Sequence, residues 1–163
     1  MKNEIAENKN HEELMELAEE IGRGYFKQGL NCAECVLRTF MDIYKVDVPD
    51  EVICMATGFG GGMGHTKNTC GAITGAVLAL GLLKGRRNPF GPKEEMGDRI
   101  KNLQGEIYPV FAEMIGEIEG KYGTLICKEM SKQFDEFDSK PRMRNCMEIV
   151  GYCAQQAVKY GEK

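Results

Sequence analysis

The spacing of apolar residues is the feature that most limits how this chain can fold. In one segment after another they recur every three or four positions, as in Leu14, Leu17, Ala18 and Ile21. This spacing places them on one face of an α-helix, whereas the period-two alternation of a half-buried strand is absent. The sequence therefore predicts an all-α protein, a single-domain bundle of six or seven helices.

Caps and breakers predict where these helices begin and end. The expected helical segments start at His11, at the N-cap Asn31, near Asp50, at Cys70 after a Thr69 cap, near Gly91, near Cys127 after a Thr124 cap, and at Pro141. Gly and Pro close them, and Pro109 should kink or break the long segment that Gly91 opens. Residues 1–10 are polar and should form a flexible, frayed N-terminus, with residues 11–163 as the domain.

Composition narrows the class of protein. The 163 residues carry a net charge of −4 and no basic block, so nucleic acid is not expected as a partner. The longest apolar run, residues 70–83, is shorter than the ~20 residues that span a bilayer. The first residues lack the apolar core of a secretory signal, so we expect a cytoplasmic protein.

Seven cysteines are unusual in such a protein. Structural disulfides are rare in the cytoplasm, so this number indicates metal binding or redox chemistry. Cysteine also packs as a small apolar residue, and two or three of the seven should simply belong to the core.

Three cysteines are expected at helix starts. Cys32 and Cys70 stand at or beside a predicted first residue, and Cys127 lies in or near a first turn. The free N–H groups and the positive dipole end of a helix favour thiolate over thiol, so we expect lowered pKa values there. His65 and Lys67 precede Cys70 and could add to this effect.

The remaining spacings allow fewer conclusions. Cys32 and Cys35 form a C-x-x-C that could be a redox pair, although no strand precedes it as in thioredoxin-like proteins, and Cys35 could equally pack in the core. Cys146 and Cys153 lie seven residues apart on one predicted helix face. At ~1.5 Å rise per residue their Cα atoms are ~10 Å apart, beyond the ~7 Å limit for a disulfide.

A glycine-rich loop at residues 58–65 precedes the predicted helix at Cys70. It lacks both the P-loop pattern and the strand that nucleotide-binding loops require. Glycine instead lets the backbone pass close to a cluster, a substrate or another helix. The candidates for lining a cofactor are Gly60, Gly61, Gly62 and Gly71. A row of small residues, Gly71, Gly75 and Ala79, would also allow tight helix packing.

Several of these motifs resemble one family. They are Asn31-Cys32-Ala33-Glu34, the glycine-rich loop, Cys70-Gly71-Ala72-Ile73-Thr74-Gly75, and the later cysteines Cys127 and Cys146. Together they resemble the C-GCAxxG-C-C family of redox-active proteins over roughly residues 20–158. The resemblance implies that Cys32, Cys70, Cys127 and Cys146 form the functional set, catalytic or metal-binding. Cys35, Cys54 and Cys153 fall outside the pattern and should be core residues.

Two function classes remain open from the sequence. The first is a redox protein in which the four cysteines hold an iron–sulfur cluster or form two reversible disulfides. A related segment lies beside the haem domains of split-Soret cytochromes, although this chain has no C-x-x-C-H for haem attachment. The second is a non-enzymatic helical protein with a structural zinc or small-ligand site. The expected partners are a redox protein or a membrane transport system, and a homodimer is possible.

Overall fold

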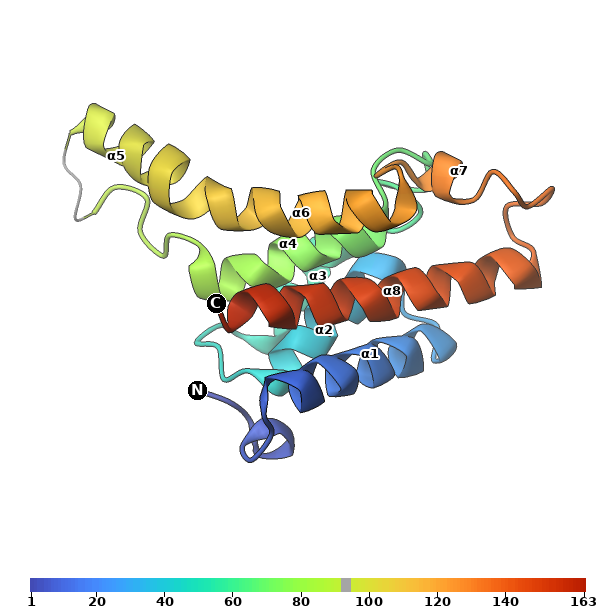
Figure 1. Ribbon diagram of the computed structural model, residues 1–163, viewed down its shortest axis with the longest axis horizontal. Coiled ribbons are helices and arrows are strands. Elements are labelled where there is room, and N and C mark those ends of the chain that lie inside the picture. The colour runs from blue at the N-terminus through green and yellow to red at the C-terminus, as the bar shows by residue number, and fades with distance from the viewer. Residues whose placement is uncertain (92–94) are drawn as a thin grey trace.

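The computed structural model describes residues 1–91 and 95–163, and it confirms the all-α prediction. Five longer helices form the bundle in Figure 1: α1 (His11–Lys27), α2 (Cys32–Ile43), α4 (Gly71–Lys84), α6 (Tyr108–Tyr122) and α8 (Lys140–Gly161). The shorter elements are η1 (Glu4–Ala6), η2 (Asp50–Ile53), α3 (Cys54–Thr57), α5 (Met96–Asn102), η3 (Leu103–Ile107) and α7 (Cys127–Met130). Within the described residues, extended pairing is limited to two isolated bridges, Lys2 with Tyr44 and Thr69 with Ile126.

Helix α8 lies at the centre of the bundle and packs against α1, α2 and α4, with α6 above it in Figure 1. The apolar faces predicted from the sequence meet in one core. Its fully buried side chains include Leu14, Phe40, Ile43, Leu80, Met114, Ile118, Val150 and Val158. None of the helices in the described part of the chain combines the length and apolar character needed to cross a membrane.

The predicted cap at Asn31 is confirmed. Its side-chain oxygen accepts hydrogen bonds from the backbone N–H groups of Ala33 and Glu34, and the Glu34 carboxylate accepts from the Asn31 N–H. This reciprocal arrangement, a capping box, satisfies the free donors of the first turn. It also fixes the start of α2 at Cys32.

Helices α2 and α4 cross with almost no side chain between them. A Cβ atom on Gly75 would lie 2.8 Å from both the Cα atom and the carbonyl oxygen of Ala33. The small-residue row predicted from the sequence therefore serves helix packing. Because the contact is near the N-terminal ends of both helices, it brings Cys32 and Cys70 to the same region.

The N-terminal segment differs from the expectation of a frayed end. The Asn3 side-chain amide donates hydrogen bonds to the carbonyl oxygens of Met41, Asp42 and Tyr44. Ala6 is fully buried against the core. The sequence suggested fraying because the segment is polar, but here one polar side chain satisfies the carbonyls at the end of α2.

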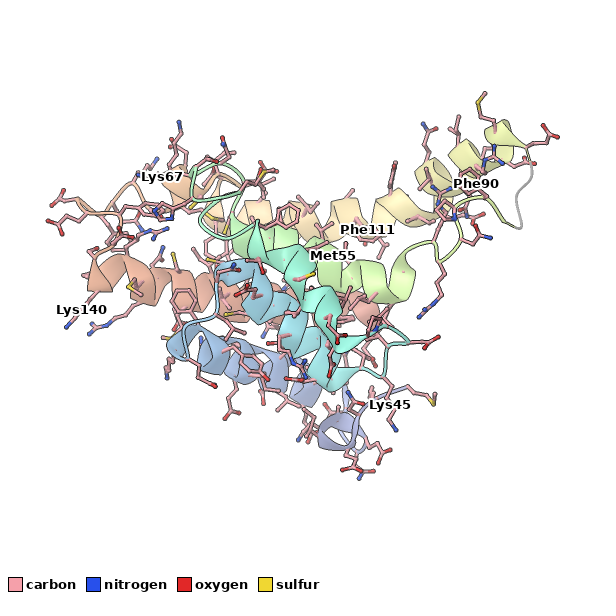
Figure 2. All side chains as sticks on the ribbon, turned by 180° about the vertical axis from the view of Figure 1, so that it is seen from behind. Lys45, Met55, Lys67, Phe90, Phe111 and Lys140 are labelled. Carbon is pink, nitrogen blue, oxygen red and sulfur yellow. The ribbon has the colours of Figure 1, made fainter. Side chains whose placement is uncertain are left out.

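The long segment predicted after Gly91 is helical from Met96 to Tyr122, in three successive stretches. The start was predicted at Gly91-Pro92, and Pro92 lies outside the described residues. The first helix after it, α5, begins at Met96. A π-helical stretch, η3, then precedes α6, whose first turn contains Pro109. The break predicted near Tyr108 is thus present as a change of helix type. The α5 end of the molecule, marked by exposed Phe90, lies opposite the end that carries Lys67 and Lys140 (Figure 2).

The crossing of α2 and α4 yields a test of packing. Gly75→Ala should lower the free energy of unfolding by about 1–3 kcal/mol, because the new methyl group overlaps backbone that cannot turn aside. Gly81→Ala is the matched control on the same helix, since a Cβ there would meet nothing within 4 Å. It should raise stability by about 0.5–1 kcal/mol. Urea denaturation measures both, and equal stabilities would contradict the packing described.

Candidate functional site

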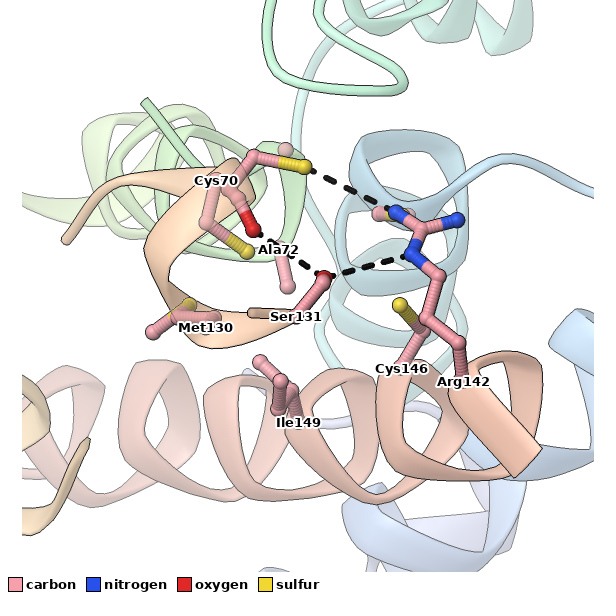
Figure 3. A pocket seen from close by; sticks show the side chains of 10 residues that line it. Cys70, Ala72, Met130, Ser131, Arg142, Cys146 and Ile149 are labelled. Atoms are coloured by element: carbon pink, nitrogen blue, oxygen red, sulfur yellow. Dashed lines mark hydrogen bonds between the residues drawn. The ribbon is translucent and has the colours of Figure 1, made fainter. Parts of the chain in front are cut away.

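Four cysteines that are far apart in the sequence line one pocket. Cys32 is the first residue of α2, Cys70 is the N-cap of α4, Cys127 is the first residue of α7, and Cys146 lies in α8. The rest of this cysteine pocket is formed by Gly71, Ala72, Met130, Ser131, Arg142 and Ile149 (Figure 3). The structure therefore brings together the four cysteines that the family resemblance singled out.

Cys70 and Cys127 meet because two chain segments pair through their backbones. The N–H of Cys70 donates to the carbonyl of Leu125 at 2.8 Å, and the N–H of Cys127 donates to the carbonyl of Asn68 at 2.6 Å. Thr69 forms the bridge with Ile126 between these bonds. The predicted capping role of Thr69 is wrong for this reason: the pairing moves the N-cap of α4 to Cys70.

The glycine-rich loop packs directly against this arrangement. A Cβ on Gly62 would lie 2.8 Å from the Cβ of Cys127, and one on Gly71 would lie 3.2 Å from the Cβ of Cys32. A Cβ on Gly60 would overlap the side chain of Asn31 at 2.8 Å. Of the four glycines proposed to line a cofactor, Gly71 lines the pocket. Gly60, Gly61 and Gly62 make room for the residues around it.

The expectation of lowered cysteine pKa values is wrong for Cys70 and Cys32. Burial raises the pKa of Cys70 to about 12, assisted by the neighbouring Cys32, although the amides of Ala72 and Ile73 favour its thiolate. Burial likewise raises the pKa of Cys146 to about 12 and also raises the pKa of Cys32. Loss of water around the sulfur thus outweighs the helix N-terminus, because desolvation penalises the charged form.

Sequence analysis missed the positive charge in this pocket, which belongs to Arg142. Its guanidinium donates to the Ser131 hydroxyl at 3.2 Å and to the Cys127 sulfur at 3.7 Å. These bonds are drawn in Figure 3. Arg142 is four residues before Cys146 on α8, a spacing that puts both on one helix face and could have indicated it.

The two basic residues expected to act on Cys70 lie elsewhere. The Lys67 ammonium is 4.4 Å from the centre of the Phe137 ring, and His65 meets the same ring edge-on at 5.0 Å. Neither lines the cysteine pocket. Both have left-handed backbone conformations.

Arg142 is only 7% exposed, yet no carboxylate among the described residues forms an ion pair with it. A buried charge without a partner is costly, and a guanidinium cannot escape the cost by losing its proton. The groups beside it that can become negative are thiols. Arg142 therefore offsets part of the cost of a negative charge in the pocket, although burial still raises the pKa values of Cys32 and Cys146.

The pocket is small. Its volume is about 10 Å³, which holds at most one water molecule. Within residues 1–91 and 95–163, no three Cys, His, Asp or Glu side chains already stand in a metal-coordinating arrangement. The four thiols match the donor set of a Cys₄ metal site in kind and number, but their sulfur atoms would have to move to coordinate one ion or cluster.

The other three cysteines have different surroundings. Cys35 is fully buried, with its thiol against the carbonyl of Leu30 at 3.6 Å, and Cys153 is also fully buried. Both agree with the expected core role. Cys54 does not, because it is exposed on α3. The C-x-x-C motif is thus divided between the pocket, which contains Cys32, and the core, which contains Cys35.

Comparison with known proteins shows the family to which the chain belongs. A family profile described as "Putative redox-active protein (C_GCAxxG_C_C)" matches residues 30–160. The chain belongs to this family. An uncharacterized protein from Archaeoglobus fulgidus is 29% identical over 126 residues, covering 74% of this chain and 77% of the relative. No solved structure matches the chain.

Burial in this C_GCAxxG_C_C protein predicts slow thiol chemistry. With a pKa of about 12, roughly one Cys70 thiol in 10⁴ to 10⁵ is ionised at pH 7.5, so iodoacetamide should modify it far more slowly than in urea-unfolded protein. The rate should keep rising as the pH increases through 10. Exposed Cys54 is the internal control and should react first. Mass spectrometry of the metal-free protein reports both sites, and equal rates at pH 7.5 would refute the described environment of Cys70.

Proposed function

We propose that this protein is an electron-transfer protein in which Cys32, Cys70, Cys127 and Cys146 hold an iron–sulfur cluster. The observation that carries the proposal is the pairing of four pocket thiols with one buried guanidinium that lacks a carboxylate partner. A cluster held by thiolates supplies reversible one-electron transfer when bound.

The raised pKa values favour a metal-thiolate site over free thiol chemistry. Exchange between a thiol and an external disulfide needs an accessible thiolate, and the pKa of about 12 at Cys70 and Cys146 makes it scarce. A bound metal ion displaces the proton and turns the same buried sulfur into a ligand. Burial, which works against a free nucleophile, also protects such a centre from water.

Charge and hydrogen bonding support the same conclusion. Four thiolates bring a net negative charge to a cluster site, and the guanidinium of Arg142 offsets part of it. The backbone amides of Ala72 and Ile73 favour negative charge on Cys70, and that of Gly61 does so on Cys32. Such donors to sulfur are among the features that set the potential of a cluster.

The elements around the pocket allow the sulfur atoms to move apart. Cys127 stands on α7, a helix of four residues, and Cys70 follows the glycine-rich loop. Between residues 57 and 69 the only buried position is Gly62. Few core contacts therefore oppose an outward shift of α7 and of the loop between residues 57 and 69. Cys32 and Cys146, in contrast, are held by the long helices α2 and α8.

The setting that suits this site is a reducing one. All seven cysteines are unpaired, and a cytoplasmic location would keep them so. The electron partner would be another redox protein or a membrane transport system.

Anaerobic purification tests the proposal. The protein should be coloured and contain iron and acid-labile sulfide, either as isolated or after reconstitution with iron and sulfide. Changing any one of the four pocket cysteines to serine should remove most of the iron, because each supplies a ligand.

Two cysteines outside the pocket provide controls. Cys54→Ser tests an exposed position and Cys35→Ala a fully buried one, and both variants should keep their iron. Colourless protein with stoichiometric zinc would replace the proposal with a structural zinc site. Protein that binds neither metal would leave reversible disulfides as the alternative.

A further inference from the structure

Phe137 lies directly on the guanidinium of Arg142. It belongs to the segment between α7 and α8, and its ring centre is 3.3 Å from the central carbon of the guanidinium. An aromatic face attracts a cation, and more strongly where water is excluded. The ring therefore lies over the guanidinium, whose N–H groups bond to Ser131 and Cys127.

The same ring contacts two residues of the loop opposite. Lys67 and His65 approach it at 4.4 and 5.0 Å, so Phe137 connects residues 58–68 with the start of α8. The loop backbone in turn accepts hydrogen bonds from α7, with Lys128 donating to the carbonyl of Lys67 at 3.2 Å. Phe137 thus contacts both the glycine-rich loop and Arg142 of α8.

Other positions are open to the arginine side chain. Asp135, Glu136 and Asp138 are exposed carboxylates in the same segment as Phe137. A long arginine side chain freed from the ring could turn toward these carboxylates or toward water, away from Cys127. The guanidinium is otherwise held by its hydrogen bonds to the Ser131 hydroxyl at 3.2 Å and to the Cys127 sulfur at 3.7 Å.

We propose that Phe137 is a positioning residue that holds the Arg142 guanidinium against Cys127 and so raises the reduction potential of the thiolate centre. The inference rests on the proposed function for its effect on potential. A nearby positive charge stabilises the reduced state, which carries one more electron than the oxidised state. No bond is formed or broken by Phe137 itself.

The first measurement is the midpoint potential of the reconstituted protein. Phe137→Leu and Arg142→Met should both lower it, so that at a fixed applied potential the ratio of reduced to oxidised protein falls at least threefold. Phe137→Tyr should restore the wild-type value because its ring face is kept. The Phe137→Leu/Arg142→Met double variant should match Arg142→Met alone, since both changes remove one interaction. Phe134→Leu, a half-buried phenylalanine three residues earlier, is the control and should leave the potential unchanged.

The second measurement needs no metal. In the metal-free wild-type protein the Nε–H of Arg142 is buried and bonded to Ser131, so its hydrogen exchange observed by NMR should be slow. Phe137→Leu should accelerate this exchange at least tenfold, and Phe137→Tyr and Phe134→Leu should not. Unchanged exchange in Phe137→Leu would overturn the positioning role. If wild-type protein bound no cluster, the proposed function would fail, and exchange would still decide the role of Phe137.

Discussion

The close approach of α2 and α4 is the constraint on which the site depends. Because Gly75 has no side chain, the backbone of α4 rests on Ala33, and the N-terminal ends of the two helices stay together. Cys32 and Cys70 are near one another for that reason. The backbone pairing around Thr69 and Ile126 then adds Cys127, and α8 adds Cys146 from the other side. The pocket is thus a consequence of helix packing and backbone pairing, with no disulfide needed to hold it.

Burial and charge oppose one another inside this pocket. Desolvation keeps the thiols of Cys70 and Cys146 protonated, while Arg142, itself buried, needs a negative neighbour. With the thiols protonated, the guanidinium has only a hydroxyl, a sulfur atom and an aromatic ring beside it. The proposed metal-thiolate centre would meet this need, because coordination would remove the thiol protons and supply negative charge beside Arg142. Four thiolates beside a guanidinium would suit zinc as well as an iron–sulfur cluster.

The sequence predicted local structure well and the environment of the site less well. Helical periodicity and the Asn31 cap gave the bundle and the start of α2, since both depend on neighbours within a few residues. The choice of the four cysteines came from the family resemblance, because spacing alone does not tell Cys32 from Cys35. Arg142, Phe137 and the exposure of Cys54 depend on contacts between distant segments, and so does the wrong sign of the pKa shift at Cys70. A helix N-terminus can be predicted from sequence, whereas the burial that outweighs it is a property of the whole fold.

The central claim is that the four pocket sulfurs act together as the ligands of one iron–sulfur centre. Iron K-edge X-ray absorption of anaerobically purified protein tests it most directly, because the spectrum reports which atoms surround the metal. We predict a first coordination shell made up of sulfur alone, with a second iron atom beyond it. A first shell of oxygen or nitrogen atoms would contradict the claim, since it would mean that the iron is bound outside the cysteine pocket.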